Sequence, residues 1–234
     1  WMGTYAVTQD LWEEIMEKNM SFFKGPKNPV ERITWFDAIL FCNKLSQRDG
    51  LTPVYQIPKG LEDLLGKRTK VTELYELSKS IQQDIDADGY RLPTEAEWEI
   101  AASGAYSFEE ETKRTRFAGS ETVEEVAWFV GNSEGTTHEV GQKKANRLGL
   151  YDMSGNVFEW CWDCYDITIS LEDEEPVILD DLVDPMGVGN SHERVRRGGS
   201  ALLVAQSCVV SERYYMDPDY LDFDQGFRLA RTAH

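Results

Sequence analysis

The stretch of residues 196–228 constrains the fold of this chain more than any other part of the sequence. Short glycine-containing motifs, Arg196–Ser200 and Gly226–Arg228, stand at its two ends. The residues between them mix aromatic, aliphatic and acidic side chains without helical or strand periodicity, in Ala201–Val204, Tyr214–Asp217 and Tyr220–Asp224. The motifs predict a rigid frame, and the mixture it carries is more typical of a binding surface than of a catalytic centre.

The net charge excludes one class of partner. Acidic residues outnumber basic ones by 42 to 24, which gives a net charge of -18. Such a surface repels the phosphates of nucleic acids and of anionic membranes, so we expect no nucleic-acid partner. No apolar run approaches the roughly 18 to 20 residues of a membrane span, and we expect no transmembrane segment.

The cysteines are too few to form a disulfide scaffold in a chain of 234 residues. Cys161 and Cys164 have the spacing of zinc and redox motifs, but no second pair and no nearby histidine completes a four-ligand zinc set. We therefore expect buried or singly paired cysteines. The three histidines, His138, His192 and His234, form no recognisable metal or nucleophile-base pattern.

The coarse pattern predicts a single irregular α+β domain over residues 1–234. Helices are expected over residues 8–16, 34–45 and 95–102, where apolar residues recur at helical spacing behind capping side chains. After residue 104, short apolar bursts and many glycines predict short strands and ordered loops. Acidic stretches at 84–88 and 172–184 are expected to be surface loops.

Several ordered motifs resemble the formylglycine-generating enzyme, or sulfatase-modifying factor, family. They include Phe41–Ser46, Gly89–Glu99, Asn146–Trp160, Arg197–Ser200 and Gly226–Arg228. The resemblance implies a C-type lectin-like fold of the formylglycine-generating enzyme type, with few short helices and strands. It also implies that Cys161 and Cys208 lie close together, whereas Trp98, Trp160 and Trp162 are expected in the core.

The enzymes of this family hold copper with two cysteines shortly after the Gly-Gly-Ser motif. Here Cys208 occupies the second position, and Leu203 stands at the first. An aliphatic side chain cannot serve as a thiolate ligand for copper(I), so we do not expect an enzyme. Two alternatives stay open, a formylglycine-generating-type oxidase and an inactive accessory domain of the family.

The C-terminal frame is closer still to one subgroup, the variable proteins of diversity-generating retroelements. In those systems, errors made in copying template adenines change the amino acids that the template's Asn codons encode. The resemblance implies a non-catalytic protein whose residues 197–228, the variable segment, display a diversified surface for an unknown protein or other surface ligand. The varied positions, hereafter the slots, are expected at Leu202, Leu203, Val204, Ser207, Glu212, Tyr214, Tyr215, Met216, Asp217, Tyr220, Asp222, Phe223 and Asp224.

Substitution of the adenines in an Asn codon yields codons for most residue types found in the slots. Glu212 and Met216 depart from that codon pattern. Ala201 and Leu221 are left open as further varied positions. Tyrosine, phenylalanine and aspartate suit a binding site, because aromatic rings supply contact area at low entropic cost. The alternative is that Leu202, Leu203, Val204 and some tyrosines pack into a core strand. The resemblance to this subgroup also implies a location on the bacterial cell surface, through an N-terminal lipid anchor or leader outside this sequence.

The same resemblance implies one possible cofactor. Residues 152–159 are similar to the family's calcium loop, in which Asp152 and Glu159 would offer carboxylates and Gly155 and Val157 would offer carbonyls. A structural calcium ion is therefore an expectation, and no cofactor is required. The alternative is that Glu159 forms hydrogen bonds within the protein.

Overall fold

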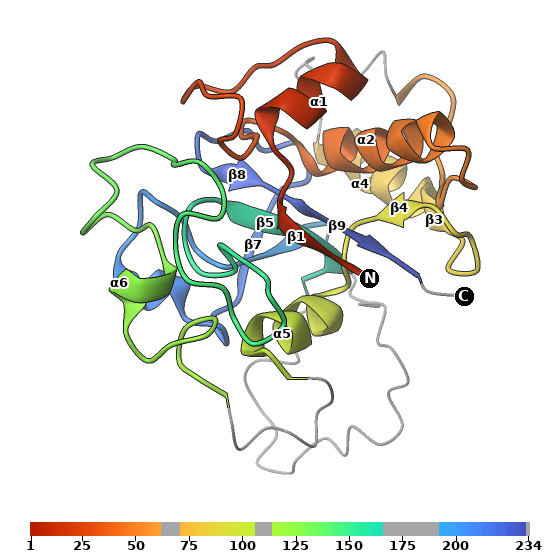
Figure 1. The fold of residues 1–234 in the computed structure, drawn as a ribbon. Helices are drawn as coiled ribbons and strands as arrows, with labels where there is room; N and C mark the ends of the chain where they lie inside the picture. The colour runs from red at the N-terminus through yellow and green to blue at the C-terminus, as the bar shows by residue number, and fades with distance from the viewer. Residues whose placement is uncertain (62–70, 106–113, 166–191, 233–234) are drawn as a thin grey trace.

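The structure is a computed structural model that describes residues 1–61, 71–105, 114–165 and 192–232. Its elements are short and form the irregular α+β arrangement that the sequence predicted (Figure 1). In chain order they are β1 (Met2–Ala6), α1 (Gln9–Met16), α2 (Trp35–Arg48), β2 (Tyr55–Gln56), α4 (Val71–Ser80), β3 (Gln82–Gln83), β4 (Tyr90–Arg91), α5 (Glu95–Ser103), α6 (Val123–Val126), β5 (Phe158–Cys164), β6 (Arg194–Arg197), η3 (Ala205–Cys208), β7 (Tyr214–Met216), β8 (Gln225–Gly226) and β9 (Arg228–Arg231). The predicted acidic loop at 172–184 lies outside the described residues.

Two sheets position the variable segment. One has the strand order β1-β9-β4, and the other has the order β7-β6-β5-β8. Strand β9 joins the two ends of the chain, because it pairs with β1 and the N-terminal ammonium of Trp1 donates to the carbonyl of Arg231 at 2.7 Å. Phe227, fully buried, stands between β8 and β9 and so connects the two sheets. The Gly-Phe-Arg motif is therefore the junction of the fold.

The three predicted helices are confirmed as α1, α2 and α5. Helix α2 begins with a capping box, in which Thr34 Oγ1 accepts from Asp37 N at 3.0 Å and Asp37 Oδ2 accepts from Thr34 N at 2.9 Å. Helix α5 begins in the same way with Thr94 and Glu97. None of the described helices has the length and apolar character that a membrane crossing needs.

The core tryptophans lie where the sequence predicted them. Trp160 and Trp162 belong to the large hydrophobic cluster under α1 and α2, and Trp98 belongs to a second cluster beside α5. The indole nitrogen of Trp160 donates to the carbonyl of Ile33 at 3.2 Å. Buried indoles that keep a hydrogen-bond partner avoid a desolvation cost, so these rings fix the sheets to the helices.

All four cysteines are free thiols. Cys161 lies in the second cluster with Trp98, and Cys208 lies in a third cluster with Phe117 and Val126. Burial raises the pKa of Cys208 to about 12, so its thiol is neutral near pH 7. Cys42, Cys161 and Cys208 therefore act as apolar core residues, whereas Cys164 is half-buried.

Candidate binding surface

The variable segment begins with a turn that only glycine can form. Gly198 and Gly199 have φ angles of 92° and 70°, in the left-handed region. A Cβ atom on Gly199 would lie 2.4 Å from the carbonyl oxygen of Ser207, which is backbone and cannot move aside easily. The close approach holds η3 against the start of the segment, and the Gly-Gly-Ser motif is explained by this contact.

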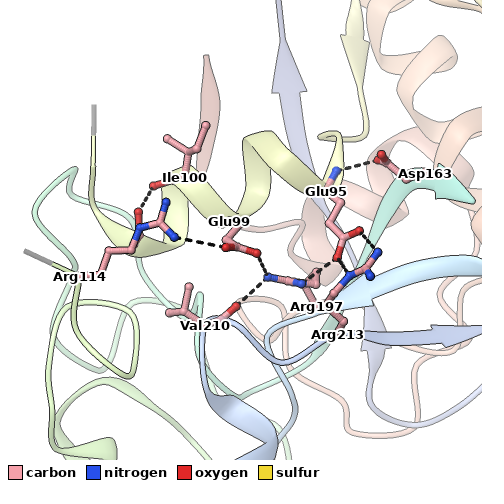
Figure 2. Close-up of polar contacts among 9 residues, drawn as sticks. Glu95, Glu99, Ile100, Arg114, Asp163, Arg197, Val210 and Arg213 are labelled. Carbon is pink, nitrogen blue, oxygen red and sulfur yellow. Dashed lines mark hydrogen bonds and ion pairs between the residues drawn. The ribbon is translucent and has the colours of Figure 1, made fainter. Parts of the chain in front are cut away.

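A partly buried ionic network, in which Arg197 is the one fully buried member, then fixes residues 210–213 to α5 (Figure 2). Arg197, fully buried, donates to Glu95 Oε1 at 2.7 Å, to Glu99 Oε2 at 2.5 Å and to the carbonyl of Val210 at 2.8 Å. Arg213 donates from Nε and NH2 to the two oxygens of Glu95, each at 2.7 Å. Paired guanidinium and carboxylate groups of this kind are strong and directional. Arg213 therefore holds the loop before β7 to α5 through a carboxylate.

The first turn of α5 also receives a carboxylate from β5. Asp163 Oδ2 accepts from the backbone N–H of Glu95 at 2.7 Å (Figure 2). Burial raises the pKa of Asp163 to about 7. The helix start that carries the ionic network is therefore itself anchored to the sheet that carries β6 and β7.

The four residues expected to bind calcium are arranged around a buried ion pair. Glu159 accepts from Arg228 Nε at 2.7 Å and from Arg228 NH2 at 2.8 Å, and it also accepts from Trp98 Nε1 at 2.7 Å. Asp152 Oδ2 accepts from Gly141 N at 2.7 Å, and burial raises the pKa of Asp152 to about 6. Calcium would have to displace Arg228 and leave a buried guanidinium without its partner.

Within the described ranges, no group of three or more His, Cys, Asp or Glu side chains is arranged to hold a metal ion. Gly155 N donates to the carbonyl of Gly198 at 2.8 Å, so this loop supports the variable segment directly. The residues present therefore fit an ion pair better than a calcium site.

Most slots lie at or near the surface. The side chains of Val204, Tyr215, Tyr220 and Phe223 are exposed, with relative exposures of 60%, 42%, 37% and 41%. Half-buried slots are Leu202, Leu203, Glu212, Tyr214, Met216, Asp217 and Asp222. Ala201, which was left open, is fully buried, and Leu221 is exposed. The slots are therefore arranged mainly as a surface, although Met216 also packs against the large core cluster.

Two of the predicted slots, Ser207 and Asp224, are buried. Asp224 Oδ2 accepts from Ser200 Oγ at 2.5 Å, and the carbonyl of Asp224 accepts from Phe158 N at 2.7 Å. Ser207 lies in η3, against Gly199. A surface role was therefore the wrong expectation for these two side chains, because the turn at Gly199 and the end of β5 enclose them.

Strand pairing divides the tyrosines between two faces. In the antiparallel pair of β6 and β7, Tyr214 lies opposite Arg196 and Tyr215 lies opposite Val195. Neighbouring residues of a strand point to opposite faces of the sheet. Tyr214 contacts Phe158 edge to face, with 5.1 Å between ring centroids, whereas Tyr215 stacks on Tyr165 at 4.0 Å. The slots thus do not form one continuous aromatic patch.

Residues outside the variable segment add to this surface, and they were not predicted from the sequence. The exposed ring of Phe22 contacts Phe223, with 4.8 Å between centroids. The guanidinium of Arg32 lies 5.5 Å from the centroid of Phe223. The pair Phe22 and Phe23, in a stretch without helical periodicity, was the available signal for an exposed aromatic loop.

The positions that bind copper in the enzymes hold no pair of thiols. Leu203 is half-buried, and its carbonyl accepts from Val130 N at 2.9 Å. The Cys208 Sγ atom lies 4.0 Å from the carbonyl of Ser200. An aliphatic side chain and one buried neutral thiol do not supply the soft thiolate ligands that copper(I) needs.

Comparisons with known proteins agree with this geometry. The sequence profile of the sulfatase-modifying factor enzyme 1-like domain matches residues 1–233. The chaperone protein LppX of Paenibacillus barcinonensis is 35% identical over 249 residues, which cover 99% of this chain and 80% of LppX. The formylglycine-generating enzyme of Streptomyces coelicolor is 34% identical over 162 residues, and the match covers 62% of this chain and 48% of that enzyme.

This chain is also similar to a solved structure over nearly its whole length. Treponema denticola variable protein 1 has a TM-score of 0.81 and 37% sequence identity, and the match covers 98% of this chain and 83% of that protein. The C-type lectin-like fold that the sequence motifs predicted is therefore shown, and so is the resemblance to a variable protein.

Proposed function

Since this chain belongs to the sulfatase-modifying factor enzyme 1-like family, we propose that it is a non-catalytic ligand-binding member of that family. In this proposal the variable segment displays a diversified surface for a protein partner. The copy described here is one member of a varying repertoire. Its location is the bacterial cell surface, through a lipid anchor outside this sequence.

The observation that carries the non-catalytic half of the proposal is the residue at the first copper position. Leu203 has no ligand atom, and Cys208 is buried in a hydrophobic cluster. Copper(I) selects soft sulfur ligands, so a site with one protonated thiol supports neither metal binding nor oxidation of a substrate thiol. The similarity to Treponema denticola variable protein 1 supports the same reading.

The arrangement of the variable segment supports the binding half. Its frame is rigid, since Arg197, Cys208, Phe227 and Arg228 are buried. The exposed slots carry two tyrosines and a phenylalanine, which supply large contact areas on few rotatable bonds. An aromatic pair contributes about 0.5–1.5 kcal/mol beyond its buried area, so several such contacts support a specific complex. A rigid frame with exposed, dissimilar side chains allows the slots to change without loss of the fold.

A copper and peptide assay separates this proposal from an oxidase. The protein is loaded with copper under reducing conditions and incubated with a peptide that carries the sulfatase cysteine motif. We expect mass spectrometry to detect an unmodified peptide thiol. Conversion of that thiol to the aldehyde would contradict the non-catalytic proposal. The diversification half fails if the source gene has no nearby near-identical repeat with Asn codons at the slots and no reverse transcriptase.

A chaperone function is a second candidate, because the Paenibacillus relative bears that description and matches 99% of this chain. Exposed apolar side chains at Met20, Phe22 and Leu221 favour it, since contacts with unfolded chains need such surface. The two candidates differ in selectivity. A chaperone would suppress the aggregation of an unrelated heat-labile enzyme at near-equimolar ratio, whereas a specific binding protein would leave that aggregation unchanged.

A further inference from the structure

An arginine outside the slots lies beside the slot Phe223. The backbone N–H of Arg32 donates to the carbonyl of Asp222 at 3.0 Å, and its guanidinium lies 5.5 Å from the centroid of the Phe223 ring. The φ angle of Arg32 is 58°, in the left-handed region that residues other than glycine rarely adopt. Such backbone conformations cost free energy and are concentrated at functional sites. Arg32 therefore attaches the segment before α2 to the variable segment, at a position that calls for an explanation.

The guanidinium of Arg32 is unpaired and reaches solvent. Among the residues that the structure describes, it forms no hydrogen bond and no ion pair, whereas Arg197 and Arg228 bind glutamates. The residue is half-buried, but none of its nitrogens belongs to the buried polar atoms that lack a partner. Its N–H donors are therefore accessible to a ligand. A guanidinium offers five such donors in a planar fork.

Two exposed aromatic rings stand next to this cation. Phe22 and Phe223 are 59% and 41% exposed, and their ring centroids lie 4.8 Å apart. The loop that carries Phe22 is anchored from below, because the backbone N–H of Phe23 donates to the buried carboxyl group of Glu31 at 2.8 Å. Contiguous exposed apolar side chains mark interaction sites. The surface here thus combines two apolar rings with one unpaired cation.

The charges around Arg32 favour an anion, although the chain as a whole is acidic. Lys24 adds a second positive charge, and both cations act on the carboxyl group of Glu31. Burial raises the pKa of Glu31 to about 7, so below that pH its carboxyl group is mostly neutral. The carboxylate of Asp222 accepts from Phe223 N at 2.8 Å and forms no ion pair with Arg32. Near pH 6 the two cations therefore outnumber the single carboxylate of Asp222.

We propose that Arg32 receives a carboxylate of the protein partner, while Phe22 and Phe223 pack against an apolar side chain next to that carboxylate. The proposal rests on the proposed binding function and adds the chemistry of the partner. A carboxylate accepts two parallel N–H bonds from a guanidinium, a pairing stronger than that of a neutral acceptor. An ammonium would meet repulsion from Arg32 and Lys24. Arg32 and Phe22 are then a constant contact beside a slot that changes.

Nuclear magnetic resonance of the arginine side chains tests this assignment. The full chain, labelled with ¹⁵N-arginine, is titrated near pH 6 with hydrocinnamate, acetate or hydrocinnamamide at matched ionic strength, and the Arg32 Nε–H signal gives the midpoint for each probe. We expect the midpoint for hydrocinnamate to be at least about threefold lower than for acetate, because its ring adds an aromatic contact, and at least about threefold lower than for the uncharged amide. Arg116 is the matched control, because it is exposed but its neighbouring ring, Phe117, is buried. Its signal should not distinguish the two acids.

A Phe22→Ala variant tests the aromatic half of the proposal. Without this ring, the midpoint for hydrocinnamate should rise towards that for acetate, and the midpoint for acetate should stay unchanged. Tyr5→Ala is the matched control, because it removes a ring that is 41% exposed on β1, and it should keep the preference for hydrocinnamate. Thermal melting of both variants checks that they fold.

Three results would overturn the inference. They are an Arg32 signal that neither acid shifts, an amide or acetate midpoint as low as that of hydrocinnamate, and a preference for hydrocinnamate that Phe22→Ala leaves intact. The titration uses no protein partner, so its failure is separate from a failure of the proposed function. Loss of partner binding when the exposed aromatic slots are replaced would still support that function if the carboxylate site failed.

Discussion

The ionic network around Glu95 allows a demanding prediction about Glu95→Gln. The carboxylate of Glu95 accepts one hydrogen bond from Arg197 and two from Arg213, all at 2.7 Å, and its side chain is only 15% exposed. Glutamine keeps one acceptor oxygen but replaces the negative charge with an N–H₂ donor that faces two guanidinium groups. Fully buried Arg197 then retains Glu99 and the carbonyl of Val210.

Removing one partner of a buried ion pair costs about 3–5 kcal/mol, and the contacts that remain reduce the expected loss to about 2–3 kcal/mol. For a domain of this size, that loss lowers the melting temperature by about 5–10 °C. Urea denaturation, followed by tryptophan fluorescence, measures the change in the midpoint and in the slope. We expect the midpoint to fall with little change in the slope, because the fold itself is retained.

Glu14→Gln provides the matched control. Glu14 pairs with Arg48 at 2.8 Å, but the side chains are 61% and 40% exposed, so its loss should cost at most about 1 kcal/mol. If Glu95→Gln destabilised the protein no more than Glu14→Gln, the network would not hold the variable segment to α5. The claim of a rigid frame would then be wrong.

Three further predictions follow from the geometry. Gly199→Ala should lower the unfolding free energy by more than about 2 kcal/mol in urea denaturation, since its Cβ would lie 2.4 Å from the Ser207 carbonyl, whereas Gly135→Ala, also at positive φ but in open space, should cost about 1 kcal/mol; equal losses would contradict the steric explanation. Burial raises the pKa of Glu31 from 4.5 to about 7, so the folded state holds the proton more tightly and stability should fall as pH rises from about 4.5 to about 7, by up to about 3 kcal/mol. Denaturation at several pH values should show this slope in the wild type and a flatter one in Glu31→Gln, and an unchanged slope in the variant would refute the assignment. Calcium at millimolar concentration should leave the melting temperature of EDTA-treated protein unchanged, because Glu159 is paired with Arg228, and an increase would favour the calcium loop instead.

The sequence predicted the frame well because its motifs encode local geometry. Capping residues Thr34 and Thr94 marked two helix starts, and both capping boxes are present. The Gly-Gly-Ser and Gly-Phe-Arg motifs marked a tight turn and a sheet junction. Helix α4, in contrast, was missed, although Val71, Leu74 and Tyr75 stand at the i, i+3, i+4 spacing of a helix.

The binding surface was predicted less completely, because burial depends on contacts distant in sequence. Nothing near Asp224 indicates that Ser200 will enclose it, and a run of Tyr214 and Tyr215 does not reveal which face each ring will occupy. Phe22 joins the surface through contact with Phe223, across some 200 residues of sequence. Strand alternation predicts opposite faces for adjacent residues, but only after the strand itself is known.

The central claim, a rigid frame that carries a partner-binding surface, is tested most directly by replacing exposed aromatics. Peptides are first selected from a phage-displayed random library on the immobilised protein, and their binding is compared for the wild type, a Tyr215→Ala, Tyr220→Ala and Phe223→Ala triple variant, and Tyr5→Ala. Tyr5 is 41% exposed, like Tyr215 at 42%, but it lies on β1 outside the slots. We expect the triple variant to lose at least about tenfold in affinity while melting within a few degrees of the wild type, and Tyr5→Ala to bind normally. Unchanged affinity in the triple variant, or unfolding of that variant, would contradict the claim.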